Sequence, residues 1–173
     1  LIIINKIIKK TKINFKFIDL GGGMGISYSR KEKQINLRKY AQLVNKFLKN
    51  KDSKIIFEPG RFIIGNAAIL ITKIIYIKKS NNKNFIILDA GMNDLMRPAL
   101  YNAHHHIVPV NKKGKFSGNN LKFVGPICES TDKFSDQKTF SQIKEGDYVS
   151  LTNVGAYGMT LSSNYNTRPI IAE

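Results

Sequence analysis

The stretch Ile18-Asp19-Leu20-Gly21-Gly22-Gly23 is a short apolar run that ends at a glycine turn. The stretch Ile56-Phe57-Glu58-Pro59-Gly60-Arg61 repeats this pattern about one βα unit later. Glycine lets the backbone approach a phosphate closely, and a helix start behind the turn attracts an anion. Two such turns at neighbouring strand ends predict a shared phosphate site, to which the second turn adds a carboxylate and a guanidinium.

The residues around the two turns predict a βαβ unit. Strands are expected at residues 15–20 and 54–57, with a helix between them that Asn36 caps. A strand, a helix and a second strand in this order predict a parallel pair, with both turns at the strand ends where α/β barrels place their active sites. Helical spacing predicts one buried face that consists of Leu37, Tyr40, Ala41, Val44, Phe47 and Leu48.

The pattern changes near residue 67. Short β-type runs follow, separated by turn clusters such as residues 80–84, 112–114 and 145–147. We therefore expect an α/β part over residues 1–66 and an all-β part, an antiparallel β-domain, over residues 67–173. The expected strands are residues 69–77, 85–88, 106–110, 121–124 and 148–152.

Composition narrows the class of protein. The chain has 173 residues and a net charge of +16, but the basic residues are mostly scattered lysines without interleaved aromatics. Such scattering disfavours a nucleic-acid partner. No apolar run reaches the length of about 20 residues that spans a membrane. One cysteine, Cys128, excludes an intrachain disulfide framework and favours a cytoplasmic protein.

No metal site is expected. The adjacent histidines at 104–106 would alternate faces in a strand and could not converge on one ion. Arginine, in contrast, is informative because lysine is the usual cation of this chain. A retained arginine favours a planar, two-pronged donor, and Arg61, Arg97 and Arg168 each lie beside a proline in a turn region.

Five segments occurring in one order make the chain resemble a known family. It resembles the C-terminal half of the diaminopimelate decarboxylases, pyridoxal-phosphate enzymes of the ornithine decarboxylase type with an alanine-racemase-like (β/α)8 barrel and a β-domain. The resemblance covers nearly the whole chain and implies that residues 1–66 are the tail of the barrel and that the chain is a fragment. The segments are Gly-Gly-Gly-Met-Gly at 21–25, Glu-Pro-Gly-Arg at 58–61, Met-Asn-Asp-Leu-Met-Arg-Pro-Ala-Leu-Tyr at 92–101, Cys-Glu-Ser-Thr-Asp at 128–132 and Gly-Ala-Tyr-Gly at 155–158.

The resemblance implies pyridoxal 5'-phosphate as the cofactor. The two turns and the hydroxyl of Tyr157 would hold its phosphate, and Glu58 would face the pyridine nitrogen. A carboxylate there favours the protonated ring, which is the better electron sink. The residues implied for cofactor binding are Gly21, Gly22, Gly23, Glu58, Gly60, Arg61 and Tyr157.

The implied reaction is decarboxylation of meso-diaminopimelate, a small amino acid, to L-lysine. Cys128 would return a proton to the α-carbon, since a thiol is mostly protonated near neutral pH. Glu129 would accept a hydrogen bond from the distal ammonium. In this family both residues reach the active site of the partner subunit, which implies a homodimer. The residues implied for substrate binding are Arg61, Arg97, Tyr101, Glu129 and Tyr157.

Some features depart from the family pattern. Asn102 stands where an acidic residue is usual, and His104 and His106 replace tyrosine and glutamate. The lysine that carries the cofactor is implied to lie upstream, so this chain alone is expected to be inactive. Two alternatives remain open, a basic amino-acid decarboxylase for ornithine or arginine, and a non-catalytic paralogue that binds a decarboxylase subunit.

Overall fold

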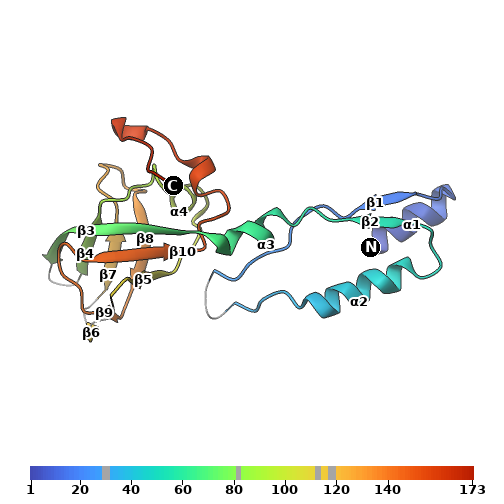
Figure 1. The fold of residues 1–173 in the computed structure, drawn as a ribbon, viewed down its shortest axis with the longest axis horizontal. Coiled ribbons are helices and arrows are strands. Elements are labelled where there is room, and N and C mark those ends of the chain that lie inside the picture. Colours follow the sequence, from blue (N-terminus) through green and yellow to red (C-terminus); the bar gives the residue numbers. More distant parts are fainter. Residues whose placement is uncertain (29–31, 81–82, 112–113, 117–119) are drawn as a thin grey trace. The chain divides into compact units, whose positions relative to one another are not determined.

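A computed structural model describes residues 1–28, 32–80, 83–111, 114–116 and 120–173 (Figure 1). Contacts divide the chain into two compact units. We call residues 1–27 and 33–63 the βαβ unit, and residues 28–32 and 64–173 the sheet unit. Parts of two predicted turns, residues 81–82 and 112–113, lie outside the described residues.

The βαβ unit has the predicted parallel strand pair. Ile18 of β1 lies opposite Ile55 of β2. The expected helix cap is also present, because the Asn36 side chain accepts a hydrogen bond from the backbone N–H of Lys39 at 3.0 Å. The elements are α1 (Ile2–Thr11), β1 (Phe17–Asp19), α2 (Leu37–Leu48) and β2 (Lys54–Ile56).

The predicted apolar face of α2 is only partly buried. Val44 and Phe47 are buried and Tyr40 is half-buried, whereas Leu37 and Ala41 are exposed. The prediction of one fully buried face was therefore wrong for this unit. The reason is that a two-stranded sheet offers too little surface to cover a helix, and α1 buries no residue of its own.

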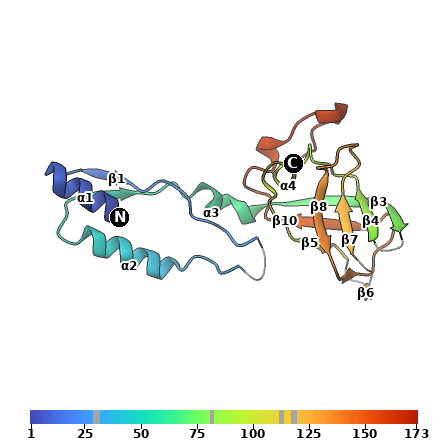
Figure 2. The same ribbon diagram turned by 180° about the vertical axis from the view of Figure 1, so that it is seen from behind.

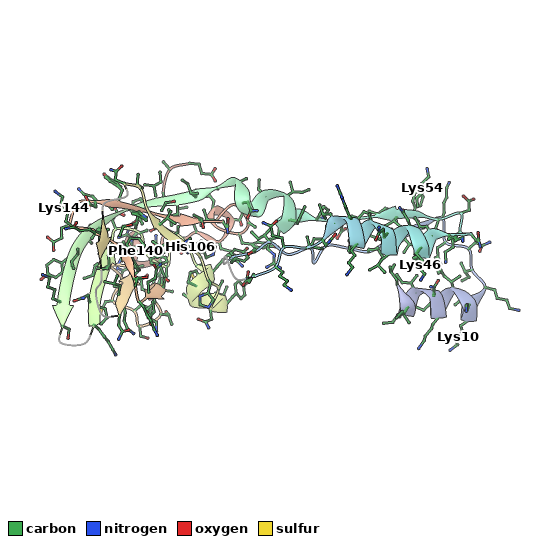
Figure 3. All side chains as sticks on the ribbon, turned by 90° about the horizontal axis from the view of Figure 1, so that it is seen from below. Lys10, Lys46, Lys54, His106, Phe140 and Lys144 are labelled. Carbon is green, nitrogen blue, oxygen red and sulfur yellow. The ribbon has the colours of Figure 1, made fainter. Side chains whose placement is uncertain are left out.

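Lysine side chains are exposed on both units. Lys10, Lys46 and Lys54 project from the βαβ unit and Lys144 from the sheet unit (Figure 3). Among the described residues, no helix combines the length and the hydropathy needed to cross a membrane.

The sheet unit is built around one curled sheet of six strands, in the order β5-β10-β3-β4-β7-β8 (Figures 1 and 2). A separate two-stranded sheet pairs β6 with β9. The short helices are α3 (Gly60–Ile64), which begins in the βαβ unit, η1 (Gly65–Ala67), α4 (Arg97–Tyr101), η2 (Met159–Leu161) and η3 (Tyr165–Thr167). The strands are β3 (Ile69–Ser80), β4 (Lys83–Leu88), β5 (Ile107–Pro109), β6 (Lys115–Phe116), β7 (Leu121–Val124), β8 (Lys133–Gln137), β9 (Phe140–Ser141) and β10 (Tyr148–Thr152).

The sheet is mixed, which corrects the prediction of a purely antiparallel domain. β4 and β7 pair in parallel, with Ile86 opposite Phe123. A parallel pair needs a long crossover, and residues 89–120 supply it because they include α4 and β5, and β5 joins β10 at the far edge of the sheet. Strands β6, β8 and β9 were not predicted, since they are short and carry few apolar residues.

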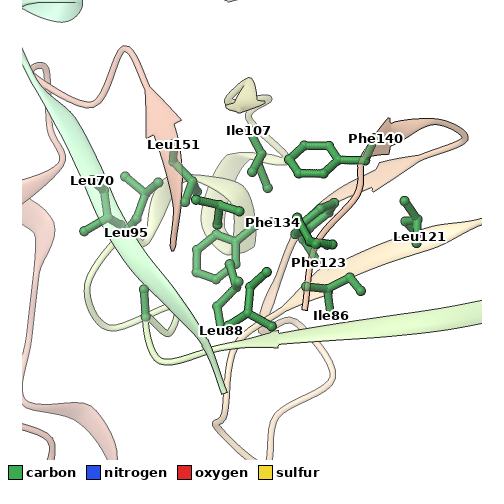
Figure 4. Packing of buried hydrophobic residues seen from close by; sticks show 14 of the residues in the cluster. Leu70, Ile86, Leu88, Leu95, Ile107, Leu121, Phe123, Phe134, Phe140 and Leu151 are labelled. Carbon is green, nitrogen blue, oxygen red and sulfur yellow. The ribbon is translucent and has the colours of Figure 1, made fainter. Parts of the chain in front are cut away.

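A single hydrophobic core lies against the curled sheet (Figure 4). Leu88 and Phe123 are fully buried, and the rings of Phe123 and Phe140 pack with their centroids 5.0 Å apart. Strand β3 alternates, so that Leu70 and Ile74 face this core while their neighbours along the strand are exposed. The core therefore fixes the position of the strand ends from which the functional loops leave.

We expect Ile74→Ala to lower the free energy of unfolding by roughly 2–5 kcal/mol, because it leaves a cavity in a fully buried part of the core. Ile75→Ala is the matched control, since its side chain is 46% exposed on the same strand, and it should cost about 1 kcal/mol or less. Urea denaturation of both variants measures the difference. Equal losses would contradict the assigned faces of β3.

Candidate cofactor and substrate site

The two predicted turns lie side by side in the βαβ unit. The strand pairing continues beyond β1 and β2, because Leu20 N–H donates to the Ile56 carbonyl at 3.0 Å and Glu58 N–H donates to the Gly21 carbonyl at 2.9 Å. The glycine triplet and the Glu-Pro-Gly-Arg corner are thus adjacent at the carboxyl ends of two parallel strands.

Close packing explains why this turn is made of glycine. Gly21 and Gly23 adopt φ angles of 65° and 76°, which side chains disfavour. A Cβ atom on Gly22 would lie 2.6 Å from the Glu58 carbonyl oxygen. The N–H groups of Gly22 and Gly23 have no hydrogen-bond partner among the described residues. The turn therefore offers backbone donors on a surface that no side chain obstructs.

The corner after β2 presents its charged groups outward. The Glu58 side chain is exposed and that of Arg61 is half-buried. The N–H of Gly60, which was predicted to hold the phosphate, donates to the Glu58 carbonyl at 2.9 Å in this structure. Helix α3 has only five residues, so its dipole adds little to the site.

In the sheet unit, Arg97 is the central candidate residue. It begins α4 and is only 6% exposed. Its guanidinium carbon lies 4.8 Å from the ring centroid of Tyr28 and 5.9 Å from that of Tyr157. No carboxylate among the described residues pairs with it, and its Nε–H is buried without a partner. A buried cation that no carboxylate neutralises is expected to bind an anionic ligand.

Tyr157, the second predicted residue near Arg97, has a strained backbone. Its φ of 63° lies in the left-handed region, which costs roughly 1–2 kcal/mol for a side-chain-bearing residue. The flanking glycines cannot be replaced, because a Cβ on Gly155 would lie 2.0 Å from the Ile64 carbonyl oxygen and one on Gly158 would lie 2.3 Å from that of Val154. This crowding forces the turn and leaves the Tyr157 ring half exposed beside Arg97.

The loop that carries Cys128 and Glu129 is exposed. Its base is held by Asp132, whose carboxylate oxygens accept hydrogen bonds from Met92 N–H at 2.7 Å and Ile127 N–H at 2.8 Å. Burial raises the pKa of the Asp132 carboxyl, an effect that these two N–H donors oppose. Asp132 thereby joins the Cys128 loop to the loop that leads to Arg97.

A segment near the C-terminal end that contains Tyr165 and Arg168, here called the covering segment, contacts these loops. Arg168 pairs with the buried carboxylate of Asp94 at 3.6 Å and donates to the Asp89 carbonyl. The hydroxyl of Tyr165 donates to the Glu129 carboxylate at 3.5 Å. Arg168, one of the three arginines that the sequence singled out, therefore has a structural partner inside the chain.

Two further residues that the sequence analysis named lie at the end of α4. Tyr101 is 63% exposed at the end of α4. Asn102 caps that helix with a φ of 52°, a conformation that asparagine tolerates better than an acidic residue with a longer side chain. The structure brings Arg97 and Tyr157 together in the sheet unit, and Gly21, Gly22 and Glu58 together in the βαβ unit.

Sequence reasoning missed three residues that shape this site. Tyr28 stacks on Arg97, His105 Nε2 accepts a hydrogen bond from Arg97, and Asp132 ties two loops together. Asp132 could have been found, because it ends the Cys-Glu-Ser-Thr-Asp segment. Tyr28 carries no local signal, since the fold brings it to Arg97 from a distant part of the sequence. His105 lies eight residues from Arg97 within the histidine triplet, whose spacing does not indicate this contact.

The described part of the chain shows no metal cluster at these residues, and a cavity of the sheet unit has a different lining. Within the described ranges, no group of three or more His, Cys, Asp or Glu side chains could hold a metal ion. A cavity of about 710 Å³ lies between the start of β3 and the covering segment, where Asp94 and Arg168 line it. Arg97, Cys128 and Tyr157 do not line this cavity.

Comparison with known proteins places these motifs in a family. The model of the pyridoxal-dependent decarboxylase C-terminal sheet domain matches residues 6–155. Diaminopimelate decarboxylase of Aquifex aeolicus is 45% identical over 160 residues, which are 92% of this chain and 38% of that protein.

Comparison with solved structures points to the same family. The chain matches diaminopimelate decarboxylase from Helicobacter pylori complexed with L-lysine, with a TM-score of 0.85 and 41% identity over 97% of this chain and 41% of that one. Lysine/ornithine decarboxylase from Vibrio vulnificus has a TM-score of 0.80 at 18% identity over 96% of this chain and 45% of that one, a likeness of fold alone. This chain thus spans about two fifths of the length of its curated relatives. It belongs to the pyridoxal-dependent decarboxylases, whose C-terminal sheet domain it contains.

Proposed function

We propose that this chain is the C-terminal part of a cytoplasmic enzyme that uses pyridoxal 5'-phosphate to decarboxylate meso-diaminopimelate to L-lysine. The buried Arg97 guanidinium, which no carboxylate of the described residues neutralises, is the observation that carries the choice of substrate. Diaminopimelate has a second carboxylate for this cation to bind. Ornithine and arginine have only a cationic group at that end.

The glycine turn of the βαβ unit supports the cofactor assignment. A phosphate needs several N–H donors on an open backbone surface, and Gly22 and Gly23 offer such donors beside the Glu58 corner. When bound, pyridoxal phosphate supplies an electron-withdrawing ring that stabilises negative charge at the α-carbon as carbon dioxide leaves. We assign Glu58 to hold a proton on the ring nitrogen, and Arg61 and the Tyr157 hydroxyl to bind anionic oxygens.

The same assignment gives roles to the exposed loop of the sheet unit. Cys128 delivers the proton to the α-carbon after carbon dioxide leaves, and Glu129 accepts a hydrogen bond from the distal ammonium. Arg61, Tyr101 and Tyr157 complete the substrate-binding set with Arg97. The exposure of Cys128 and Glu129 supports action across a dimer interface, in which this loop enters the active site of the partner subunit.

We assign the βαβ unit to the tail of a (β/α)8 barrel and place the boundary to the β-domain near residue 67. The poor burial of this unit supports the assignment. Only three apolar side chains of this unit are buried, Ile18, Val44 and Phe47. Its two-stranded parallel sheet also leaves apolar side chains such as Ile56 and Leu43 exposed. Parallel sheets are covered on both faces in folded proteins, so further barrel strands and helices are expected to pack on this unit.

Turnover of the full-length protein on meso-diaminopimelate and on ornithine tests the proposed substrate. We expect a clear preference for diaminopimelate, and Arg97→Lys should raise KM for it roughly tenfold or more, since an ammonium loses the two-pronged contact. Arg38→Lys, on the exposed side of α2, is the matched control. A preference for ornithine would refute the proposal, and a folded protein inactive on both would favour the non-catalytic paralogue.

Substitution in the glycine turn tests the cofactor site. Gly22→Ala should weaken pyridoxal-phosphate binding about tenfold, because the new Cβ would force the turn away from Glu58. Gly25→Ala should bind nearly normally, since a Cβ there meets no atom within 4 Å. Titration of the apoprotein, followed by cofactor absorbance, measures both affinities. Normal binding by Gly22→Ala would remove the turn from the site.

The proton donor is tested separately. Cys128→Ala should bind the cofactor normally and lose roughly 10²-fold or more in kcat, because a positioned acid typically contributes that much. Ser130→Ala, which changes an exposed neighbour in the same loop, should keep wild-type turnover. Normal turnover by Cys128→Ala would mean that another group delivers the proton.

A further inference from the structure

The three adjacent histidines differ sharply in their surroundings. His104 and His106 are exposed, whereas His105 is 3% exposed. The histidines do not form a strand, because β5 begins only at Ile107. The sequence assigned no site role to the triplet, but the buried ring of His105 contacts Arg97, a residue of the candidate site.

The hydrogen bonds of His105 determine its protonation state. Its Nδ1 lies 3.0 Å from the Thr152 carbonyl oxygen, which can only accept, so Nδ1 must carry a proton. Its Nε2 lies 3.1 Å from Nη1 of Arg97, which can only donate, so Nε2 must be bare. Both bonds form together only in the neutral tautomer with the proton on Nδ1.

We propose that His105 is a positioning residue, which as a neutral imidazole orients the guanidinium of Arg97 toward the distal carboxylate of the substrate. The inference rests on the function proposed above and adds a residue that neither the motifs nor the family match assigns. Tyr28 completes the arrangement. Its ring packs edge-on against the His105 ring, with the two ring centroids 5.3 Å apart, and lies under the Arg97 guanidinium.

A neutral partner suits this task better than a carboxylate. Aspartate or glutamate at this position would form an ion pair with Arg97 and reduce its attraction for an anionic substrate. A neutral imidazole fixes one N–H of the guanidinium and leaves its charge available. The Nε–H of Arg97, buried without a partner among the described residues, is the kind of donor that a substrate carboxylate would satisfy.

The surroundings of His105 keep it neutral. Burial lowers the pKa of His105, and the nearby positive charge of Arg97 and the neighbouring His104 lower it further. The hydrogen bond to the Thr152 carbonyl acts in the opposite direction. Protonation would remove the acceptor for Arg97 and place two cations in contact. We therefore expect substrate affinity to fall, and KM to rise, as the pH drops through the lowered pKa of His105.

The first test reads the imidazole directly and needs no substrate. Nitrogen chemical shifts of isotope-labelled histidine in the full-length protein should show His105 as the Nδ1–H tautomer, with a pKa below the ordinary value of histidine. Signals are assigned with His104→Gln and His106→Gln, and Arg97→Met should raise the pKa of His105. An Nε2–H tautomer, or a pKa that Arg97→Met leaves unchanged, would overturn the inference.

The second test separates positioning from a purely structural role. His105→Phe keeps a ring but offers no acceptor, and should raise KM for diaminopimelate roughly tenfold or more, with kcat within about twofold. His105→Gln can accept from Arg97 and donate to Thr152, so it should restore KM and remove its dependence on pH. His106→Gln is the matched control, since His106 is exposed and is not among the groups that shift the pKa of His105.

The outcomes distinguish this inference from the proposed function. An unchanged KM in His105→Phe, or an unchanged pH profile in His105→Gln, would overturn the role of His105. Turnover on ornithine in place of diaminopimelate would refute the proposed substrate, while the tautomer and the pKa would still decide whether His105 holds Arg97.

Discussion

The carboxylate of Asp132 is the contact on which the functional loops of the sheet unit depend. It accepts hydrogen bonds from Met92 and Ile127, and so ties the loop that leads to Arg97 to the loop that carries Cys128. A buried carboxylate needs such donors, because its desolvation is otherwise costly. The curled sheet places the loop ends within reach, and Asp132 converts that proximity into a fixed geometry.

Arg97 and Arg168 differ in the groups that surround their charges. Asp94 forms an ion pair with Arg168. Arg97, in contrast, contacts two tyrosine rings and the neutral ring of His105. Aromatic faces and a neutral acceptor stabilise a cation without cancelling its charge. The half-buried Arg168 thus holds a segment of the chain, whereas the buried Arg97 is left open to an anion.

Steric limits on the backbone shape both units. In the βαβ unit, Gly22 has no room for a side chain beside the Glu58 carbonyl. In the sheet unit, Gly155 and Gly158 pack so closely that Tyr157 adopts a left-handed conformation. Strain of this kind persists only where the surrounding structure enforces it, and such positions are frequent at functional sites.

The sequence by itself determined the local elements and the family. Glycine turns, the Asn36 cap and apolar runs predicted the parallel strand pair and several sheet strands, because these signals act between neighbours in the chain. Only the tertiary structure decided that the sheet is mixed, that α2 is half covered, and that Tyr28 and His105 meet Arg97. The β4–β7 pairing and the contact of Tyr28 with Arg97 join residues that are far apart in the sequence, and they depend on how the whole sheet curls. The orientation of the nearer His105 toward Arg97 and the exposure of α2 also depend on the tertiary packing, which no local pattern of residues encodes.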